Sequence, residues 1–224
     1  MLRGKFSTKR ARQLQVQLSK QVVRRDVLPK SLRYVAGVDV AYVEKWAIGV
    51  VVVLDYASLS VVEVQKTKVK TSFPYIPTLL SFREIKPTLA AIRKLKSRPD
   101  IYMIDAQGIA HPYRLGFASH LGIILDKPTI GVAKSLLCGH LEPQAETNWV
   151  PIVDKGEIVG ASIQGDKRKR PIYVSIGHKV SLETAVKIVE HFTRSSWLPE
   201  PIRLAHMLAT EERNRQKREI KNQS

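Results

Sequence analysis

Three acidic residues stand where the sequence gives a carboxylate an unusual setting. Asp39 interrupts an apolar run in a segment of strand composition, where burying an unpaired charge would be costly. Asp105 ends the apolar run 101–104, a position where open α/β sheets bind ligands, although an isolated Asp there is also typical of a turn or helix cap. Glu84 closes a Ser-Phe-Arg-Glu segment at 81–84 that fits a helix capping box equally well. Each acid taken alone therefore also has a purely structural interpretation.

These acids acquire a shared chemistry if the fold brings Asp39, Glu84 and Asp105 into one cleft. Two like charges about 4 Å apart repel by about 4 kcal/mol at an effective dielectric near 20, so such a cluster protonates or holds a cation. Carboxylate oxygens favour Mg²⁺ or Mn²⁺, and none of the six histidines repeats at the spacing of a zinc site. Mg²⁺ beside a phosphodiester activates water and stabilises the leaving alkoxide, which is nuclease chemistry with one or two metal ions.

Two basic residues could assist that chemistry. Lys134 follows the apolar run 129–132 and could contact a reacting phosphate as a point charge. A P-loop is excluded because Ala133 stands where that motif requires glycine. His206 lies between apolar helix positions, where a lone histidine is more often structural than a ligand.

Composition and charge indicate the kind of partner. The 224 residues include 37 Lys and Arg against 20 Asp and Glu, a formal charge of +17 that favours a polyanion such as nucleic acid. Cys138 is the only cysteine, which excludes an intrachain disulfide and suits a reducing cytoplasm. The longest strongly apolar stretch, 47–54, falls short of the roughly 18 residues of a membrane span, and the N-terminus lacks an apolar signal core. We therefore expect a cytoplasmic protein with no membrane partner.

Both ends of the chain are polar and basic. Residues 1–30 hold nine Lys and Arg against one Asp, a composition shared with transit peptides. Leu14, Leu18 and Val22 repeat every four residues, however, which favours a basic N-terminal helix packed on the domain. Residues 214–224 predict a frayed polar tail. Because no repeat or long linker divides the chain, we expect one domain over 1–224, acting as a monomer.

The order of elements predicts a mixed sheet. Residues 34–42, 47–55 and 59–69 have strand composition and predict an antiparallel meander, in whose third strand Lys66, Lys68 and Lys70 share a solvated face. After a proline-rich loop at 73–77, helices are expected at 78–84, 87–96, 115–125, 182–192 and 204–213. Further strands are expected at 101–104, 129–132, 157–164 and 171–175, the last two as a hairpin with a basic connection at 165–170. This order is typical of an α/β fold with helices on both faces of a mixed sheet.

Seven segments together resemble the endonuclease V family, the deoxyinosine 3′ endonucleases. They are VAGVDVA at 35–41, FPYIP at 73–77, LSFRE at 80–84, DAQGIAHP at 105–112, LGFASHL at 115–121, PTIGVAKS at 128–135 and PEPIRLAH at 199–206. They follow the family order and span about three-quarters of the chain. The resemblance implies a ribonuclease H-like fold in which four catalytic residues, Asp39, Glu84, Asp105 and His206, bind Mg²⁺, with Mn²⁺ as a substitute. It also implies that Lys134 supports the reacting phosphate as a fifth catalytic residue.

The same resemblance implies recognition of deoxyinosine, a deaminated adenine, in double- or single-stranded DNA. Such an enzyme would hydrolyse the second phosphodiester bond 3′ to the lesion, leaving a 3′-hydroxyl and a 5′-phosphate, and so begin repair. A wedge formed by Pro74, Tyr75, Ile76 and Pro77 would enter the stack, where stiff prolines limit the loss of entropy and an aromatic face replaces the extruded base. The hypoxanthine base would occupy a pocket around Leu80, Gly108, His111, Gly116 and Leu137.

Two departures from the family pattern bear on that pocket. Ala106 and Thr78 stand where glycine is common in the family, and their bulk would narrow the pocket or change its base preference. Two other functions remain open: cleavage of inosine-containing RNA, and noncatalytic binding of nucleic acid by a protein whose acids only support the fold. The basic N-terminal helix and the 167–170 loop are expected to contact the nucleic-acid backbone, in a manner that weakens as salt rises.

Overall fold

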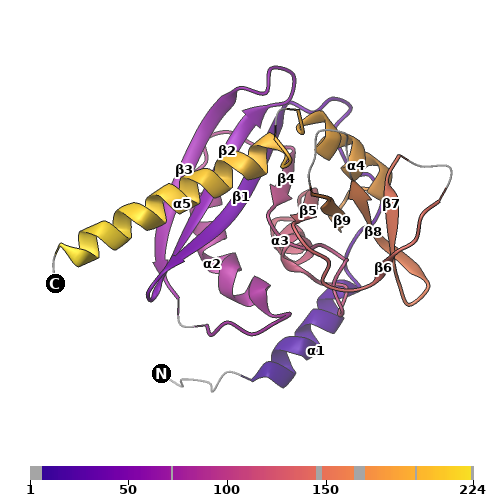
Figure 1. The fold of residues 1–224 in the computed structure, drawn as a ribbon, viewed down its shortest axis with the longest axis horizontal. Coiled ribbons are helices and arrows are strands. Elements are labelled where there is room, and N and C mark those ends of the chain that lie inside the picture. Colours follow the sequence, from indigo (N-terminus) through magenta and orange to yellow (C-terminus); the bar gives the residue numbers. More distant parts are fainter. Residues whose placement is uncertain (1–6, 72, 145–147, 164–169, 195, 223–224) are drawn as a thin grey trace.

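The computed structural model describes residues 7–71, 73–144, 148–163, 170–194 and 196–222 (Figure 1). Within these ranges one nine-stranded mixed sheet has the order β3-β2-β1-β4-β5-β9-β8-β7-β6. Its strands are β1 (Tyr34–Val43), β2 (Trp46–Asp55), β3 (Val61–Lys70), β4 (Ile101–Ile104), β5 (Thr129–Ala133), β6 (His140–Leu141), β7 (Val150–Asp154), β8 (Glu157–Ile163) and β9 (Ile172–His178). The helices are α1 (Thr8–Ser19), α2 (Leu80–Ile92), α3 (Phe117–Leu125), α4 (Leu182–His191) and α5 (Glu200–Lys221). The predicted mixed α/β fold is confirmed.

The first three strands form the predicted antiparallel meander. β1 pairs with β2 along its whole length, and β2 pairs with β3 with one irregularity between Val53 and Leu54. The third strand begins at Val61, later than predicted, because Leu59 adopts a positive φ of 59° in the preceding turn and cannot continue a strand. This meander forms one edge of the sheet.

The centre of the sheet is parallel, which places the ends of β4 and β5 beside the middle of β1. β4 pairs with β1 with Ile104 opposite Val38, and β5 pairs with β4 with Gly131 opposite Ile104. The carboxyl ends of β4 and β5 therefore lie side by side, next to the middle of β1, which continues beyond β4 to Val43. Ligands of open α/β sheets bind at such an edge.

Helices cover both faces of the sheet, as Figure 1 shows for α5 on one side of the meander and α2 on the other. Side chains alternate between the two layers: Val50 and Val52 join the core cluster that includes α5 residues, whereas Val51 and Val53 join the cluster of α2 and α3 residues. Gly37 allows the close approach of α5, because a Cβ there would collide with the carbonyl of Pro201. The start of α5 is thereby fixed against β1. Among the described helices, none is both long and apolar enough to cross a bilayer.

Helix α2 corrects the prediction of two helices divided before Pro87. It runs through that proline, which is buried inside the helix, and the Pro87 carbonyl accepts a hydrogen bond from Thr67 at 2.9 Å. Packing on the meander therefore offsets the roughly 3 kcal/mol that an interior proline costs a helix. The helix also starts at Leu80, so Ser81 lies inside it and the capping-box interpretation of Glu84 is wrong.

Helix α1 forms as predicted but packs through a different face. Ala11 and Gln15 are buried, whereas Leu14 is 40% exposed, and the helix ends before Val22. The four-residue repeat of apolar residues was therefore a misleading signal. The Gln15 side chain is buried in this contact instead, because its Nε2 donates to the backbone carbonyls of Thr78 and Leu115 there.

The last helix is longer than predicted, and the prediction of a frayed tail from 214 is wrong for the residues described. α5 continues to Lys221, with Arg215 paired to Glu212 at 2.6 Å and to Glu219 at 3.7 Å along one side. Lys68 of β3 contacts Gln216, which ties the second half of the helix to the meander.

The predicted hairpin is confirmed in β8 and β9, which pair antiparallel. Its basic connection lies outside the described residues except for Arg170. Strands β6 and β7 extend this half of the sheet and were missed, because both are short and β7 contains Pro151.

Candidate active site

Asp39 and Asp105 lie next to each other at the parallel edge. Each follows a paired residue, Val38 in β1 and Ile104 in β4, and the amide of Asp105 donates to the Val38 carbonyl at 3.1 Å. Their side chains are 15% and 11% exposed, so both are mostly buried but remain accessible to solvent. Burial, and then the charge of Asp39, raise the pKa of Asp105. The edge therefore concentrates negative charge.

His206 reaches both carboxylates from the second turn of α5. Its Nδ1 lies 2.8 Å from Asp39 Oδ2 and 3.7 Å from Asp105 Oδ2, and the hydrogen bond with Asp39 raises the pKa of His206. One ligand atom from each residue lies within 4.8 Å of the others, a spacing that one metal ion can bridge. The interpretation of His206 as a core residue does not fit, because its side chain is half-exposed.

Glu84 approaches the same edge from α2 but stays outside this group of three. Its carboxylate is buried and accepts a hydrogen bond from the Tyr42 hydroxyl at 3.2 Å. Burial, followed by the charges of Asp39 and Asp105, raises the pKa of Glu84 to about 8. The protonation of Glu84 therefore depends on the charges of the two aspartates, although Glu84 is not one of the three residues whose ligand atoms lie within 4.8 Å of one another.

Tyr42 is a residue of this site that sequence reasoning missed. It lies three residues beyond Asp39 in β1, on the face of the sheet that α2 covers, and the Arg83 guanidinium lies 4.0 Å from its ring centre. Burial raises the pKa of the Tyr42 phenol, so it remains a hydrogen-bond donor. An aromatic residue in a strand carries no sequence signal of this role.

Lys134 follows β5, the next parallel strand. Its Nζ lies 2.5 Å from Asp105 Oδ2, so it offsets part of the negative charge at the edge. The side chain is partly exposed, which leaves it accessible to an anion in solvent. Lys134 therefore contacts Asp105 and, together with it, lines the adjoining pocket.

A pocket of about 260 Å³ opens beside Asp105 and Lys134. Four of the five residues predicted to surround an extruded base are in its wall: Leu80, His111, Gly116 and Leu137. Gly108 is outside the lining, because its amide donates to Ser175 Oγ and a Cβ there would collide with the Ile176 carbonyl. Ala106 and Thr78, the two departures from the family pattern, do line the pocket.

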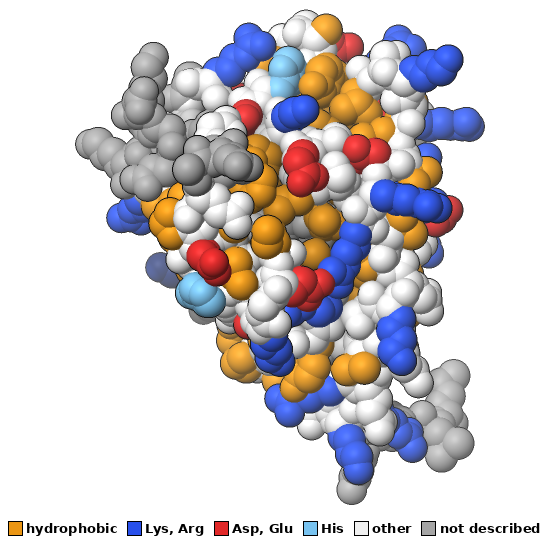
Figure 2. Space-filling view, turned by 90° about the vertical axis from the view of Figure 1, so that its right-hand side faces the viewer, with side chains coloured by type: hydrophobic (Ala, Val, Ile, Leu, Met, Phe, Trp, Pro, Cys, Tyr) orange, Lys and Arg blue, Asp and Glu red, His pale blue; other side chains and the backbone are white. Residues whose placement is uncertain are grey.

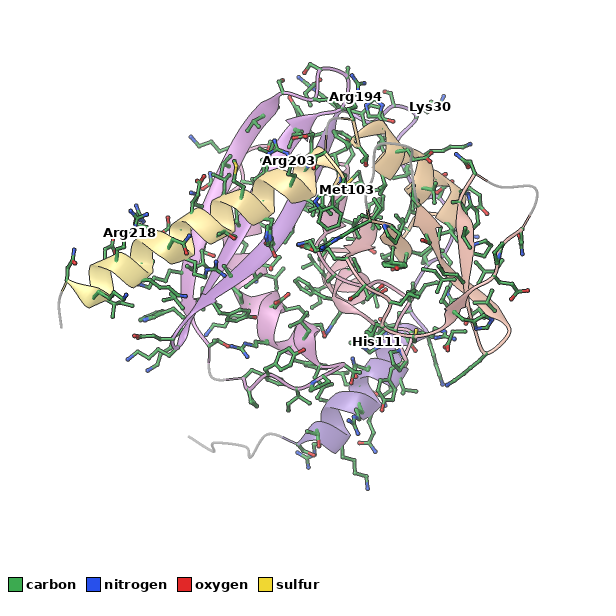
Figure 3. All side chains as sticks on the ribbon, viewed as in Figure 1. Lys30, Met103, His111, Arg194, Arg203 and Arg218 are labelled. Atoms are coloured by element: carbon green, nitrogen blue, oxygen red, sulfur yellow. The ribbon has the colours of Figure 1, made fainter. Side chains whose placement is uncertain are left out.

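His111 has a defined tautomer in this wall. Its Nδ1 accepts the Tyr113 amide at 3.2 Å, so the proton is on Nε2, which donates to the Thr78 carbonyl at 3.1 Å. Burial lowers the pKa of His111 to about 4, which keeps the ring neutral at pH 7. Figure 3 shows His111 beside α1.

The proline-rich segment stands at the mouth of the pocket. Pro74 and Pro77 are exposed, Ile76 is half-buried, and Tyr75 is 68% exposed while also lining the pocket. An aromatic ring of that exposure buries little area in the free protein, so packing on a partner would gain much.

A carboxylate in the middle of one strand, a second just after the end of the adjacent parallel strand, and a histidine from a covering helix define a nuclease of the ribonuclease H-like fold. The family model for endonuclease V matches residues 16–207. The endonuclease V of Thermofilum pendens is 48% identical over 206 residues, which cover 92% of this chain and 88% of that relative. The chain therefore belongs to the endonuclease V family, as the sequence motifs predicted.

Solved structures agree over almost the whole chain. The endonuclease V of Streptomyces avermitilis has a TM-score of 0.87 at 35% identity, covering 94% of this chain and 95% of that one. The endonuclease V of Ciona intestinalis has a TM-score of 0.84 at 33% identity, covering 92% and 98%. That relative was solved in complex with a 24mer DNA containing an inosine followed by a ribo-adenosine.

Proposed function

We propose that this protein is a Mg²⁺-dependent repair endonuclease that recognises deoxyinosine in DNA and hydrolyses the second phosphodiester bond 3′ to it. The products would be a 3′-hydroxyl and a 5′-phosphate. The observation that carries the proposal is that Asp39, Asp105 and His206 bring ligand atoms within 4.8 Å of one another, while Asp105 also lines a pocket that the exposed Tyr75 borders. The inosine-containing DNA bound by the Ciona relative supports the substrate class.

Asp39, Asp105 and His206 are the residues proposed to hold the metal ion, with Glu84 behind them. The donor set fits, because it is rich in oxygen, and because the Asp39 charge raises the pKa of both Asp105 and Glu84, a repulsion that a divalent cation would relieve. Mg²⁺, or Mn²⁺ in its place, would supply a water of lowered pKa and charge neutralisation at the phosphate.

The remaining groups bind and orient the nucleic acid. Lys134 contacts Asp105 and lines the pocket with it, and its ammonium would contact the nonbridging oxygens of the scissile phosphate. Tyr75 would take the stacking place of the extruded base, and the pocket of about 260 Å³ is near the lower end of ordinary ligand sites, which suits a single base. The base in the pocket and the cleaved bond at the metal ion would thus lie on either side of Asp105.

RNA is a second candidate substrate, because the DNA in the Ciona complex carries a ribonucleotide after its inosine. An enzyme that selects RNA senses a 2′-hydroxyl, so a single ribonucleotide 3′ to the lesion is a sufficient probe. We further propose that residues 1–224 act as one endonuclease domain and as a cytoplasmic monomer.

The test is nicking of an end-labelled duplex with one deoxyinosine, in Mg²⁺ and separately in Mn²⁺. Matched strands carry deoxyadenosine in place of the lesion, or a ribonucleotide after it. We expect one nick at the second bond 3′ to the lesion, and its loss in Asp105→Asn. No lesion-dependent nick with wild-type protein would refute the proposal, whereas cleavage confined to the ribonucleotide strand would favour RNA.

A noncatalytic binding protein makes a different prediction. If the acids only support the fold, Mg²⁺ would not raise the melting temperature, whereas a shared metal site stabilises the folded state by linkage. We expect a Mg²⁺-dependent rise in wild type that Asp39→Asn removes.

A further inference from the structure

Gln15 of α1 is a buried polar side chain outside the group formed by Asp39, Asp105 and His206. It is 0% exposed, although most of its neighbours along the helix face solvent. Its Nε2 donates to the Thr78 carbonyl at 2.7 Å and to the Leu115 carbonyl at 3.3 Å. One amide therefore joins three segments that are distant in the sequence.

Both acceptors belong to the pocket. Thr78 directly follows the proline-rich segment that carries Tyr75, and Leu115 directly precedes Gly116. Both Thr78 and Leu115 line the cavity. The Thr78 carbonyl also accepts the Nε2 proton of His111 at 3.1 Å. The base of the proline-rich segment is thus held by donors from α1 and from the pocket wall together.

Thr78 needs such support because its backbone is unfavourable for its side chain. Its φ is +69°, a left-handed conformation that β-branched residues rarely adopt, and its buried Oγ1 has no hydrogen-bond partner. A residue of this kind keeps its conformation only where its surroundings determine it. The two hydrogen bonds to its carbonyl provide that constraint.

We propose that Gln15 is a positioning residue that fixes the proline-rich segment and the adjoining pocket wall before nucleic acid binds. The role is structural preorganisation: a segment already held in place loses less entropy when Tyr75 enters a base stack. The proposal rests on the proposed function for its effect on substrate, but the clamp itself is a property of the free protein. It makes the N-terminal helix part of lesion recognition.

The variant Gln15→Met keeps the length and removes both donors, and Gln17→Met makes the same change at an exposed position of α1. Gln15→Asn retains the amide on a shorter stem and serves if Gln15→Met fails to fold. Amide hydrogen exchange over residues 73–80 tests the clamp without substrate. Because each hydrogen bond contributes modestly, we expect exchange in this segment about tenfold faster in Gln15→Met, a smaller effect in Gln15→Asn and none in Gln17→Met.

Single-turnover nicking of the deoxyinosine duplex tests the consequence. We expect the half-saturating enzyme concentration to rise about tenfold in Gln15→Met, with the rate at saturation and the Mg²⁺-induced melting shift nearly unchanged. Equal exchange in the Gln15 and Gln17 variants, or an acceleration spread evenly over the whole domain, would overturn the clamp. A wild-type enzyme without lesion-dependent nicking would instead refute the proposed function, and the exchange comparison would still decide the clamp.

Discussion

Binding of Mg²⁺ should expel a proton from Glu84. Burial and the charges of Asp39 and Asp105 raise its pKa to about 8, so about nine-tenths of this side chain is protonated at pH 7 without metal. A divalent cation beside the two aspartates reverses the sign of the field at Glu84 and favours its ionised form. We therefore expect close to one proton to leave Glu84 for each metal site filled at pH 7, and almost none at pH 9.

The size of this effect follows from the difference between the ordinary pKa of a glutamate and the raised pKa of Glu84. Raising the pKa from its ordinary value of 4.5 to about 8 makes ionisation of Glu84 in the folded protein unfavourable by on the order of 5 kcal/mol. Between those pH values the folded state binds more protons than the unfolded state, so the free energy of unfolding of the metal-free protein falls as pH rises through this window. Mg²⁺ opposes that fall, and its apparent affinity should rise by up to about tenfold per pH unit between about pH 6 and 8, then level off.

Titration calorimetry in two buffers of different ionisation enthalpy measures the released proton directly. His206 also has a raised pKa and can release a proton when its Nδ1 binds metal, so the control is Glu84→Gln, which retains His206. The difference between wild type and Glu84→Gln isolates Glu84. Equal proton release by the two proteins at pH 7, with Mg²⁺ bound by both, would refute the reasoning.

Three further outcomes follow from the same geometry. Tyr42→Phe removes a hydrogen bond that lowers the pKa of Glu84, so the midpoint of Mg²⁺-linked proton release should move about one pH unit upward, whereas Tyr102→Phe should leave it in place; a downward shift would contradict this. Tyr75→Ala should bind undamaged DNA almost normally and lose lesion-dependent nicking, and equal loss of binding to both DNAs would argue against a wedge. Alanine at Lys9, Arg10 and Arg12, exposed on α1 where basic side chains surround the lower end of Figure 2, should weaken binding to damaged and undamaged duplex equally and reduce the salt slope by about 3; an unchanged slope would exclude α1 from the DNA surface.

The sequence alone predicts those residues of this site whose type is unusual for their local secondary structure. Asp39 is unusual because a carboxylate in an apolar strand needs a partner, and Asp105 ends a short buried strand; the parallel pairing of β1 with β4 then brings them together. Family motifs were needed for His206 and Glu84, since spacing alone favoured a core histidine and a helix cap. The position of Glu84 behind the aspartates depends on the packing of α2, which periodicity does not encode.

The errors share a physical origin in tertiary packing. Leu14 was predicted to pack on the domain but is exposed, and Gln15 beside it is buried, because an amide that donates to two carbonyls can be buried in place of an apolar side chain. Pro87 predicted a break in α2 that packing against β3 overrides. The polar composition after Arg213 hid the pairing of Arg215 with two acids and of Lys68 with Gln216, which extends α5.

Under the proposed function, recognition and cleavage would be linked through Asp105, which belongs to the group of three possible metal ligands and also lines the pocket. On one side it shares His206 with Asp39 of β1, and on the other it contacts Lys134 after β5 and lines the pocket. Neighbouring strands of a sheet lie about 4.8 Å apart, so β1 and β5, with β4 between them, are about 10 Å apart, and a base held beside β5 would be displaced along the strand from a metal ion held beside β1. This separation would displace hydrolysis from the lesion, and Asp105 would contact both the metal ion and the pocket. Asp105→Asn should therefore weaken metal binding and also change how tightly the pocket holds the lesion, two effects that Asp39→Asn would separate by altering only the first.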